Sequence, residues 1–248
     1  MREPPQKSKV LITPRRIPLF STPTSENTTC SRFLVFTPYN LLFTQIVLMP
    51  DSNLYPITDR LVTRKEKENL LGSKGAVFWL TGLSGSGKST LAIELEKSLL
   101  SKELHSIILD GDNLRSGINT DLGFSDQDRR ENIRRTSEIA RILKDSGLVV
   151  IVSCITPLNE FRSIAKSIIS AEDYHEIFVK ASFETCKTRD VKGLYAKAMN
   201  SEIESFTGQK SEFEIPNSPQ LLLDTELETQ EESSSKLLSY VMSIISKT

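Results

Sequence analysis

The amino-acid sequence predicts an α/β fold with a doubly wound, mainly parallel sheet. Three observations predict it: a glycine-rich loop at 82–90, a β-prone apolar segment directly before this loop, and helical periodicity directly after it. Further apolar segments alternate with helical segments along the rest of the chain, an order that is typical of parallel sheets with helices on both faces. The loop type places the fold among the P-loop nucleoside triphosphate hydrolases and kinases.

The loop, GLSGSGKST, contains the pattern G-x-x-x-x-G-K-[ST] through Gly82, Gly87, Lys88 and Ser89. Glycines let backbone N–H groups turn toward a β-phosphate, because no Cβ blocks the required dihedral angles. The lysine reaches the β- and γ-oxygens, and the Ser89 hydroxyl is a ligand for Mg²⁺. A helix that begins at the loop adds the positive end of its dipole. The sequence therefore predicts a site for a nucleoside triphosphate with Mg²⁺.

The first elements lie on either side of this loop. The segment AVFWLT before it reads as a buried strand, and leucines recur at helical spacing after it. Ile107–Leu109 form the second expected strand, which we also expect to be buried. Asp110, Gly111 and Asp112 then fall at its carboxyl end, and ligands of open α/β sheets bind at that edge.

A long helix comes next, with Ser125 as its N-cap and Asp128 three residues later, a capping-box pattern. Gly147 ends this helix. The segment LVVIVSCI is the third expected strand, and its apolar composition suits burial on both faces. A fourth strand, EIFVKA, a fifth, QLLLD, and an amphipathic terminal helix complete the predicted order.

The composition excludes several classes of function. The chain has 248 residues and a formal net charge of −1, so no basic excess points to nucleic acid as a partner. Its cysteines, Cys30, Cys154 and Cys186, lie far apart and match no metal-binding spacing. Cys154 follows an apolar run and is expected to be a buried thiol. These features are typical of a reducing, intracellular compartment, and we expect a cytoplasmic protein.

Residues 1–50 differ in composition from residues 51–248, which form the expected folded domain. The N-terminal extension has few acids and many Ser, Thr and Pro residues, a composition compatible with disorder or with an organelle transit peptide. The alternative, which we favour, is that Met49 is the true start, because the prolines break any amphipathic helix upstream of it. The apolar run FLVFTPYNLLFTQIVLM is too short and too interrupted by polar residues for a membrane span, so no membrane partner is expected.

The residues around the loop favour a small-molecule kinase over other P-loop proteins. A GTPase would need an N-K-x-D motif, which the sequence lacks, and a motor would be larger. Asp112 can accept the proton of an attacking hydroxyl and can hold Mg²⁺; the alternative is a residue that only forms a turn. Arg115 and Arg129 flank a helix start, where arginine opposes the helix dipole; either they face an anionic acceptor or they belong to a solvated charged face balanced by nearby acids. Arg134 and Arg135 are expected to form a solvated charged face.

Six segments resemble those of adenylylsulfate kinases in order and spacing: GLSGSGKST, LDGDNLRSGINTDLGFS, DRRENIRR, RDVKGLYAKA, EIESFTG and IPNSPQLLLDT. The resemblance extends from about residue 53 to the C-terminus. It implies an ATP-dependent kinase that transfers the γ-phosphate to the 3′-hydroxyl of adenosine 5′-phosphosulfate. The products would be ADP and 3′-phosphoadenosine 5′-phosphosulfate, a step of sulfate activation. ATP and Mg²⁺ are the implied cofactors.

The resemblance also implies residue roles. The ATP phosphates would be bound by Gly82, Gly85, Ser86, Gly87, Lys88, Ser89 and Thr90. The acceptor would be bound by Asp112, Asn113, Arg115, Phe124, Arg129, Asn132, Ile155, Lys192, Ser205 and Phe206. The expected catalytic residues are Lys88, Asp112 and Thr156, and the expected Mg²⁺ ligands are Ser89 and Asp112. Phe124 and Phe206 would sandwich the acceptor's adenine. Residues 190–208 would form a lid with hinges at Gly193 and Gly208.

Two positions depart from the family pattern. Thr156 stands where many members have a serine that has been proposed as a phosphorylated intermediate; threonine keeps the hydroxyl, and we expect direct transfer. Ser205 stands where Lys, Gly or Asn is usual. The family suggests a homodimer and a functional link to a separate ATP sulfurylase. One alternative is a gluconate or shikimate kinase, which the base-stacking phenylalanines disfavour. Another is a catalytically silent nucleotide-binding subunit that supports a separate ATP sulfurylase, which the intact Lys88, Ser89 and Asp112 disfavour.

Overall fold

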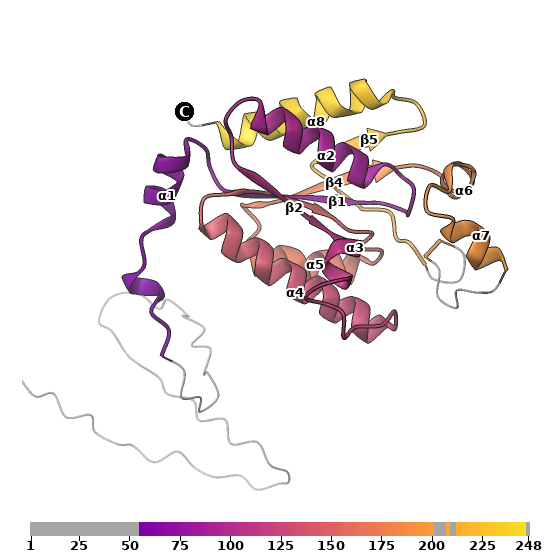
Figure 1. The fold of residues 1–248 in the computed structure, drawn as a ribbon, viewed down its shortest axis with the longest axis horizontal. Helices are drawn as coiled ribbons and strands as arrows, with labels where there is room; N and C mark the ends of the chain where they lie inside the picture. Colours follow the sequence, from indigo (N-terminus) through magenta and orange to yellow (C-terminus); the bar gives the residue numbers. More distant parts are fainter. Residues whose placement is uncertain (1–54, 201–206, 209–211, 247–248) are drawn as a thin grey trace, which may run out of the picture. The chain divides into compact units, whose positions relative to one another are not determined.

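The structure is a computed structural model that describes residues 55–200, 207–208 and 212–246. Within these residues a five-stranded sheet carries helices on both faces (Figure 1). All neighbouring strands are parallel, in the order β2-β3-β1-β4-β5, which confirms the predicted doubly wound α/β fold. The strands are β1 (Ala76–Thr81), β2 (Ser106–Asp110), β3 (Val149–Ser153), β4 (Tyr174–Lys180) and β5 (Leu221–Asp224).

Helices precede the first strand, connect successive strands and follow the last strand. A short 3₁₀ helix and α1 precede the sheet; the helices are η1 (Thr58–Arg60), α1 (Arg64–Leu71), α2 (Lys88–Leu100), α3 (Gly111–Arg115), α4 (Asp126–Asp145), α5 (Asn159–Ile169), α6 (Phe183–Arg189), α7 (Leu194–Met199) and α8 (Gln230–Ile245). The N-cap prediction for α4 is confirmed, because the Ser125 side chain accepts a hydrogen bond from the backbone N–H of Asp128. Helix α4 ends before Gly147, whose φ of 86° is the left-handed conformation that glycine favours.

The core lies in two apolar layers, one on each face of the sheet. Helices α2 and α8 cover one face and α4 and α5 cover the other (Figure 1). Strand β1 supplies both layers, because alternate residues of a strand point to opposite faces. Phe78 and Leu80 pack under α2 and α8, whereas Val77 and Trp79 pack under α4 and α5. Strands β1 and β3 are buried along their whole length, as predicted.

Strand β2 lies at an edge of the sheet, and the prediction that it is buried was wrong. Ile107 and Ile108 are only half-buried, and Leu109 is the one buried residue of the strand. The reason is the strand order: β2 has a single neighbour, β3, so part of its surface stays open. An apolar run of this length does not reveal whether a strand is central or at an edge.

The carboxyl ends of all five strands meet at one edge of the sheet, which Figure 1 shows on its right-hand side together with α3, α6 and α7. A crevice at this edge is the usual ligand site of open α/β folds. None of the helices in the described residues is long and apolar enough to cross a membrane. Residues 1–54 lie outside the described part, so the predicted boundary between extension and folded domain stays a prediction.

Candidate active site

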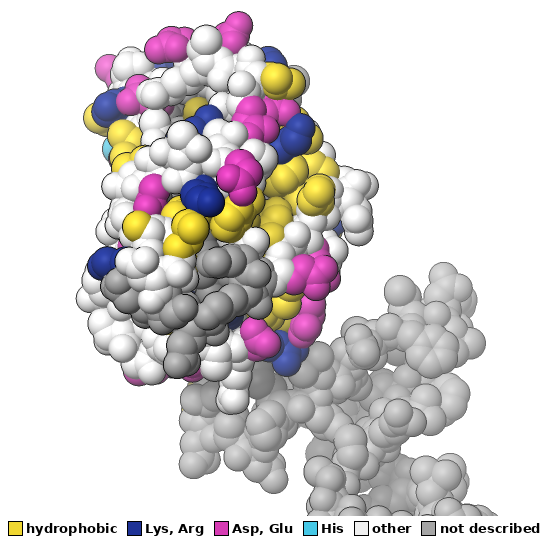
Figure 2. All heavy atoms as spheres, turned by 90° about the vertical axis from the view of Figure 1, so that its right-hand side faces the viewer, with side chains coloured by type: hydrophobic (Ala, Val, Ile, Leu, Met, Phe, Trp, Pro, Cys, Tyr) yellow, Lys and Arg dark blue, Asp and Glu magenta, His cyan; other side chains and the backbone are white. Residues whose placement is uncertain are grey.

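A cleft of about 1460 Å³ lies along the carboxyl edge of the sheet. Its walls come from the P-loop, the end of β2 with α3, the start of α4, the turn after β3, and the segment around α6 and α7. Figure 2 looks onto this edge, where basic and acidic side chains surround an area of apolar side chains. The sequence predicted ligand binding at this edge, and the structure gathers most of the predicted residues there.

The P-loop joins β1 to α2 in a backbone conformation that depends on glycine. Gly82, Gly85 and Gly87 have φ values of 152°, 79° and 102°, which other residues rarely adopt. A Cβ atom on Gly82 would also lie 2.3 Å from the carbonyl oxygen of Val179. Helix α2 begins at Lys88, directly after the loop, so the positive end of its dipole adjoins the cleft. The loop and the helix start together form a site suited to phosphate.

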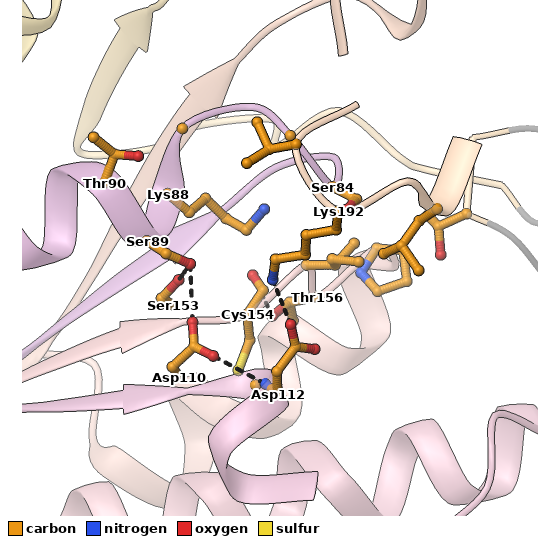
Figure 3. Close-up of a pocket in the computed structure, with 18 of the residues that line it drawn as sticks. Ser84, Lys88, Ser89, Thr90, Asp110, Asp112, Ser153, Cys154, Thr156 and Lys192 are labelled. Atoms are coloured by element: carbon orange, nitrogen blue, oxygen red, sulfur yellow. Dashed lines mark hydrogen bonds and ion pairs between the residues drawn. The ribbon is translucent and has the colours of Figure 1, made fainter. Parts of the chain in front are cut away.

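Lys88 is buried, with 8% of its surface exposed. Its Nζ donates hydrogen bonds to the carbonyl oxygens of Gly82, at 3.0 Å, and of Leu83, at 2.7 Å. Burial disfavours the charged form and lowers the pKa of the Lys88 ammonium to about 8. Figure 3 shows the Lys88 and Lys192 side chains pointing toward the same space from opposite sides. The ammonium is therefore placed where it can meet a phosphate oxygen.

Ser89 lies beside Asp110 rather than beside Asp112. Its hydroxyl donates to Oδ2 of Asp110 at 2.9 Å and lies 3.1 Å from the hydroxyl of Ser153 (Figure 3). Asp110 also begins α3, because its Oδ1 accepts from the backbone N–H of Asp112 at 3.0 Å. Ser89 was predicted to share Mg²⁺ with Asp112, and no role was predicted for Asp110, although the DGD segment at the end of β2 contains both carboxylates. A hydroxyl beside a carboxylate fits Mg²⁺, which prefers oxygen ligands.

Asp112 contributes a largely exposed carboxylate from α3. Its side chain is 67% exposed, and Oδ2 forms an ion pair with the Nζ of Lys192 (Figure 3). Lys192 comes from the turn between α6 and α7, so this pair joins two walls of the cleft. Both residues were predicted to lie at the site. A direct contact of Asp112 with Mg²⁺ stays a prediction.

Two arginines and an aromatic ring form a basic corner of the cleft, made by Arg115, Phe124 and Arg129. The Arg115 guanidinium lies 4.4 Å from the centre of the Phe124 ring, which is 63% exposed. Arg129 donates to the carbonyl oxygen of Phe124 at 2.9 Å and to the hydroxyl of Thr207 at 2.8 Å. Burial lowers the pKa of both guanidiniums, and their mutual repulsion lowers that of Arg115 further. An anion between them would relieve both effects.

The Thr156 hydroxyl is held inside the protein. Thr156 is 2% exposed, and its Oγ1 accepts a hydrogen bond from the Trp79 indole at 2.8 Å. Its φ of 45° is unusual for a β-branched residue. Asn132, also buried, accepts a hydrogen bond from Asn119 at 2.9 Å. Cys154 is a buried thiol as predicted, and burial raises its pKa to about 12.

The predicted residues divide into three groups. Those that line the cleft are Gly85, Gly87, Lys88, Ser89, Thr90, Asp112, Arg115, Phe124, Arg129, Asn132, Ile155, Thr156 and Lys192. Those that are described but do not line it are Gly82, Ser86 and Asn113. Ser205 and Phe206 lie outside the described residues, as does part of the predicted lid.

Arg189 is a lining residue that the sequence analysis missed. Its guanidinium donates to the carbonyl oxygen of Thr225 at 2.6 Å and to the Thr225 hydroxyl at 3.1 Å. That hydroxyl in turn donates to the carbonyl oxygen of Ser86 at 3.0 Å, so Arg189 is linked to the P-loop. Its only signal in the sequence is its place in the segment RDVKG, where it precedes the expected lid.

A family model, curated relatives and a solved structure point to one family. The family model described as adenylylsulphate kinase matches residues 74–224. The adenylyl-sulfate kinase of Phocaeicola vulgatus is 53% identical over 199 residues, which are 80% of this chain and 98% of that protein. The adenylyl-sulfate kinase of Bacillus pumilus is 46% identical over 183 residues, 74% of this chain and 93% of that protein.

A solved structure gives the same result. The APS kinase of Mycobacterium tuberculosis, in complex with AMPPNP and APS, is 43% identical to this chain, with a TM-score of 0.65. The match covers 68% of this chain and 98% of that one. The family match, the relatives and this structure agree with one another. The chain therefore belongs to the adenylylsulphate kinase family.

Proposed function

We propose that the chain transfers the γ-phosphate of ATP to the 3′-hydroxyl of adenosine 5′-phosphosulfate. The products are ADP and 3′-phosphoadenosine 5′-phosphosulfate. Family membership supports this activity. The observation in the molecule that carries it is one cleft that contains both a P-loop and a basic corner with an exposed aromatic ring. The first suits a donor triphosphate, and the second suits an acceptor that has a base and a charged tail.

On the donor side, the P-loop backbone and Lys88 bind the β- and γ-phosphates of ATP. Ser89 and Asp110 would hold Mg²⁺, because their hydroxyl and carboxylate oxygens lie 2.9 Å apart and Mg²⁺ prefers oxygen ligands. When bound, Mg²⁺ neutralises charge on the phosphates. When ATP binds, the Lys88 ammonium donates its hydrogen bonds to phosphate oxygens instead of to the carbonyl oxygens of Gly82 and Leu83. It keeps its proton, because a nearby anion favours the charged form.

On the acceptor side, Arg115 and Arg129 pair with the phosphosulfate oxygens, and the Phe124 ring stacks on the adenine. Asp112 accepts the proton of the 3′-hydroxyl as the oxygen attacks the γ-phosphorus. Lys192 contacts Oδ2 of Asp112, which leaves Oδ1 for that proton. In this scheme the phosphate passes directly to the acceptor, and the buried Thr156 hydroxyl accepts a hydrogen bond from the Trp79 indole.

The test is a coupled assay with purified protein, ATP, Mg²⁺ and adenosine 5′-phosphosulfate, in which ADP release is recorded and the nucleotide product is identified by mass spectrometry. Adenosine monophosphate, gluconate and shikimate serve as comparison acceptors. We expect rapid ADP release with adenosine 5′-phosphosulfate and much slower ADP release with each of the three comparison acceptors. Faster ADP release with gluconate or shikimate would contradict the proposal.

We further propose that the chain is a cytoplasmic homodimer whose substrate comes from a separate ATP sulfurylase. The family resemblance supports the dimer and the sulfurylase link. Two free thiols in the described residues, Cys154 and Cys186, suit a reducing compartment. Light scattering during size-exclusion chromatography would give the mass, and a monomer at working concentration would contradict the proposed assembly.

A further inference from the structure

Arg162 of α5 is a buried arginine, with 4% of its surface exposed, and it contacts a turn that lines the cleft. One terminal nitrogen donates to the carbonyl oxygens of Thr156, at 2.7 Å, and of Pro157, at 3.2 Å. The other donates to the carbonyl oxygen of Glu214 at 2.7 Å. Its Nε pairs with the Glu176 carboxylate at 3.1 Å. The guanidinium is thus compensated on every side, as a buried charge must be.

Two of these contacts reach a strained turn that lines the cleft. Thr156 and Pro157 both line it, and Thr156 has a φ of 45°, which costs energy for a β-branched residue. Such a conformation persists only where neighbouring groups determine it. Here Arg162 holds the carbonyl group of Thr156, and the Trp79 indole holds its hydroxyl. The turn is therefore fixed from its backbone and from its side chain.

The remaining contacts join this turn to the segment Phe213–Glu214. The backbone N–H of Glu214 donates to the Pro157 carbonyl oxygen at 2.9 Å, and the Glu214 carboxylate accepts from the backbone N–H of Asn159. The Arg162 guanidinium also lies 5.9 Å from the centre of the Phe213 ring. Arg162 is the side chain that contacts both partners, so the turn and the segment form one unit around it.

We propose that Arg162 is a positioning residue for acceptor binding, because it holds the Thr156–Pro157 turn in the conformation that shapes the acceptor side of the cleft. This inference rests on the proposed function, in which the acceptor is adenosine 5′-phosphosulfate. None of the Arg162 contacts given above lies in the P-loop, so we expect ATP binding to depend on Arg162 less than acceptor binding does. Lysine cannot replace it, since one ammonium cannot reach the turn and Glu214 at once in the way the planar guanidinium fork does.

The first test is Arg162→Lys in the full chain. We expect the KM for adenosine 5′-phosphosulfate to rise about tenfold or more, the effect of losing hydrogen bonds to a charged group. The KM for ATP should stay within about twofold. Trp79 is the single tryptophan of the chain and bonds directly to Thr156, so its fluorescence reports on the turn without any substrate. We expect a changed emission maximum in this variant.

Two control variants separate positioning from general stability. Arg64→Lys removes a comparable set of contacts, to Glu68, Asp173 and the Gly75 carbonyl, in a region that does not line the cleft. It should lower Tm but change neither KM nor the Trp79 emission. Glu176→Gln removes the ion pair and keeps the Arg162 hydrogen bonds, so the KM for the acceptor should stay unchanged.

Three outcomes decide the proposal. A rise in the acceptor KM with an altered Trp79 emission supports it. Equal rises in both KM values, or an unchanged emission maximum with an unchanged acceptor KM, overturn it. If Arg162→Lys does not fold, the double variant Arg162→Met/Glu176→Gln, which leaves no unpaired charge, is measured by the same criteria. If the unmodified protein does not phosphorylate adenosine 5′-phosphosulfate, the proposed function fails, while the emission measurement still tests whether Arg162 sets the turn.

Discussion

Burial lowers the pKa of the Lys88 ammonium, and this shift has a measurable consequence for nucleotide binding. In the free protein burial lowers the pKa of its ammonium from the usual 10.5 to about 8. Below that pH Lys88 is charged and attracts the triphosphate; as pH rises through about 8 the free protein loses this proton. A bound phosphate favours the charged form, so the pKa rises on binding and the affinity for ATP must fall at higher pH.

We therefore expect ATP affinity to be constant below about pH 8 and to fall by at most tenfold per pH unit above it. Isothermal titration calorimetry across this range measures it. Lys88→Met, which lacks the titrating group, should bind ATP more weakly and with a flatter pH dependence. A wild-type affinity that stays constant well above pH 8 would show that Lys88 keeps its proton in the free protein.

The Asp112 carboxylate is expected to act in the chemical step rather than in nucleotide binding. Asparagine keeps the shape but cannot accept a proton, and general-base help contributes about 10²–10⁴-fold to a rate. Asp112→Asn should lower kcat by an amount in this range while the Kd for ATP changes little. Asp121→Asn is the matched control, because Asp121 is also an exposed carboxylate paired with a cation, Arg135. A near-normal kcat for Asp112→Asn would remove this residue from the chemistry.

The Phe124 ring is a candidate platform for the acceptor's adenine. It is 63% exposed, so the core does not require it, and the Arg115 guanidinium lies over it. Stacking a base on an aromatic ring contributes about 1–3 kcal/mol. Phe124→Ala should therefore weaken binding of adenosine 5′-phosphosulfate by roughly fivefold to a hundredfold, with ATP affinity unchanged. Equal losses for both nucleotides together with a lower Tm would instead indicate a structural role for the ring.

At the scale of elements, the start of α4 places two residues of the proposed acceptor site, Arg129 and Asn132, in the cleft. The Ser125 N-cap fixes this start through its bond from the Asp128 N–H. Ser125→Ala should cost about 0.5–2 kcal/mol of unfolding free energy, as lost N-caps do. Thr63→Ala removes the N-cap of α1, which does not line the cleft, and should cost a similar amount. We expect the acceptor KM to rise for Ser125→Ala only.

Sequence reasoning succeeded where the interacting groups lie within a few residues of one another. The P-loop glycines, the Ser125 cap and the end of α4 at Gly147 are of this kind. It failed where strand order decides the outcome, since the edge position of β2 follows from a pairing that no local pattern encodes. The same holds for the site: Asp110 meets Ser89 across 21 positions, and Trp79 meets Thr156 across 77.

At the scale of the whole molecule, parallel strand order is what makes one cleft from distant segments. Residues of the P-loop, of α3, of the turn after β3 and of the α6–α7 region are far apart in the chain, yet all follow the carboxyl end of a strand. Because every strand of the sheet points the same way, these segments reach the same edge. The two apolar layers that hold the sheet are built within the described residues from Ala76 to Ile245.

This distribution of the core leads to a prediction about the N-terminal extension. A chain that starts at Met49 should keep its kcat and KM values and change its Tm by less than about 2 °C, since it retains α1 and both apolar layers. A shorter chain that starts at Ser73 provides the contrast. It loses Arg64, which donates to both carboxylate oxygens of Asp173, at 2.6 and 2.8 Å, and so leaves that half-buried carboxylate with Lys144 as its cation. Its Tm should fall clearly below that of the chain from Met49.

A large loss of Tm or of activity already in the chain from Met49 would show that residues 1–48 belong to the working enzyme.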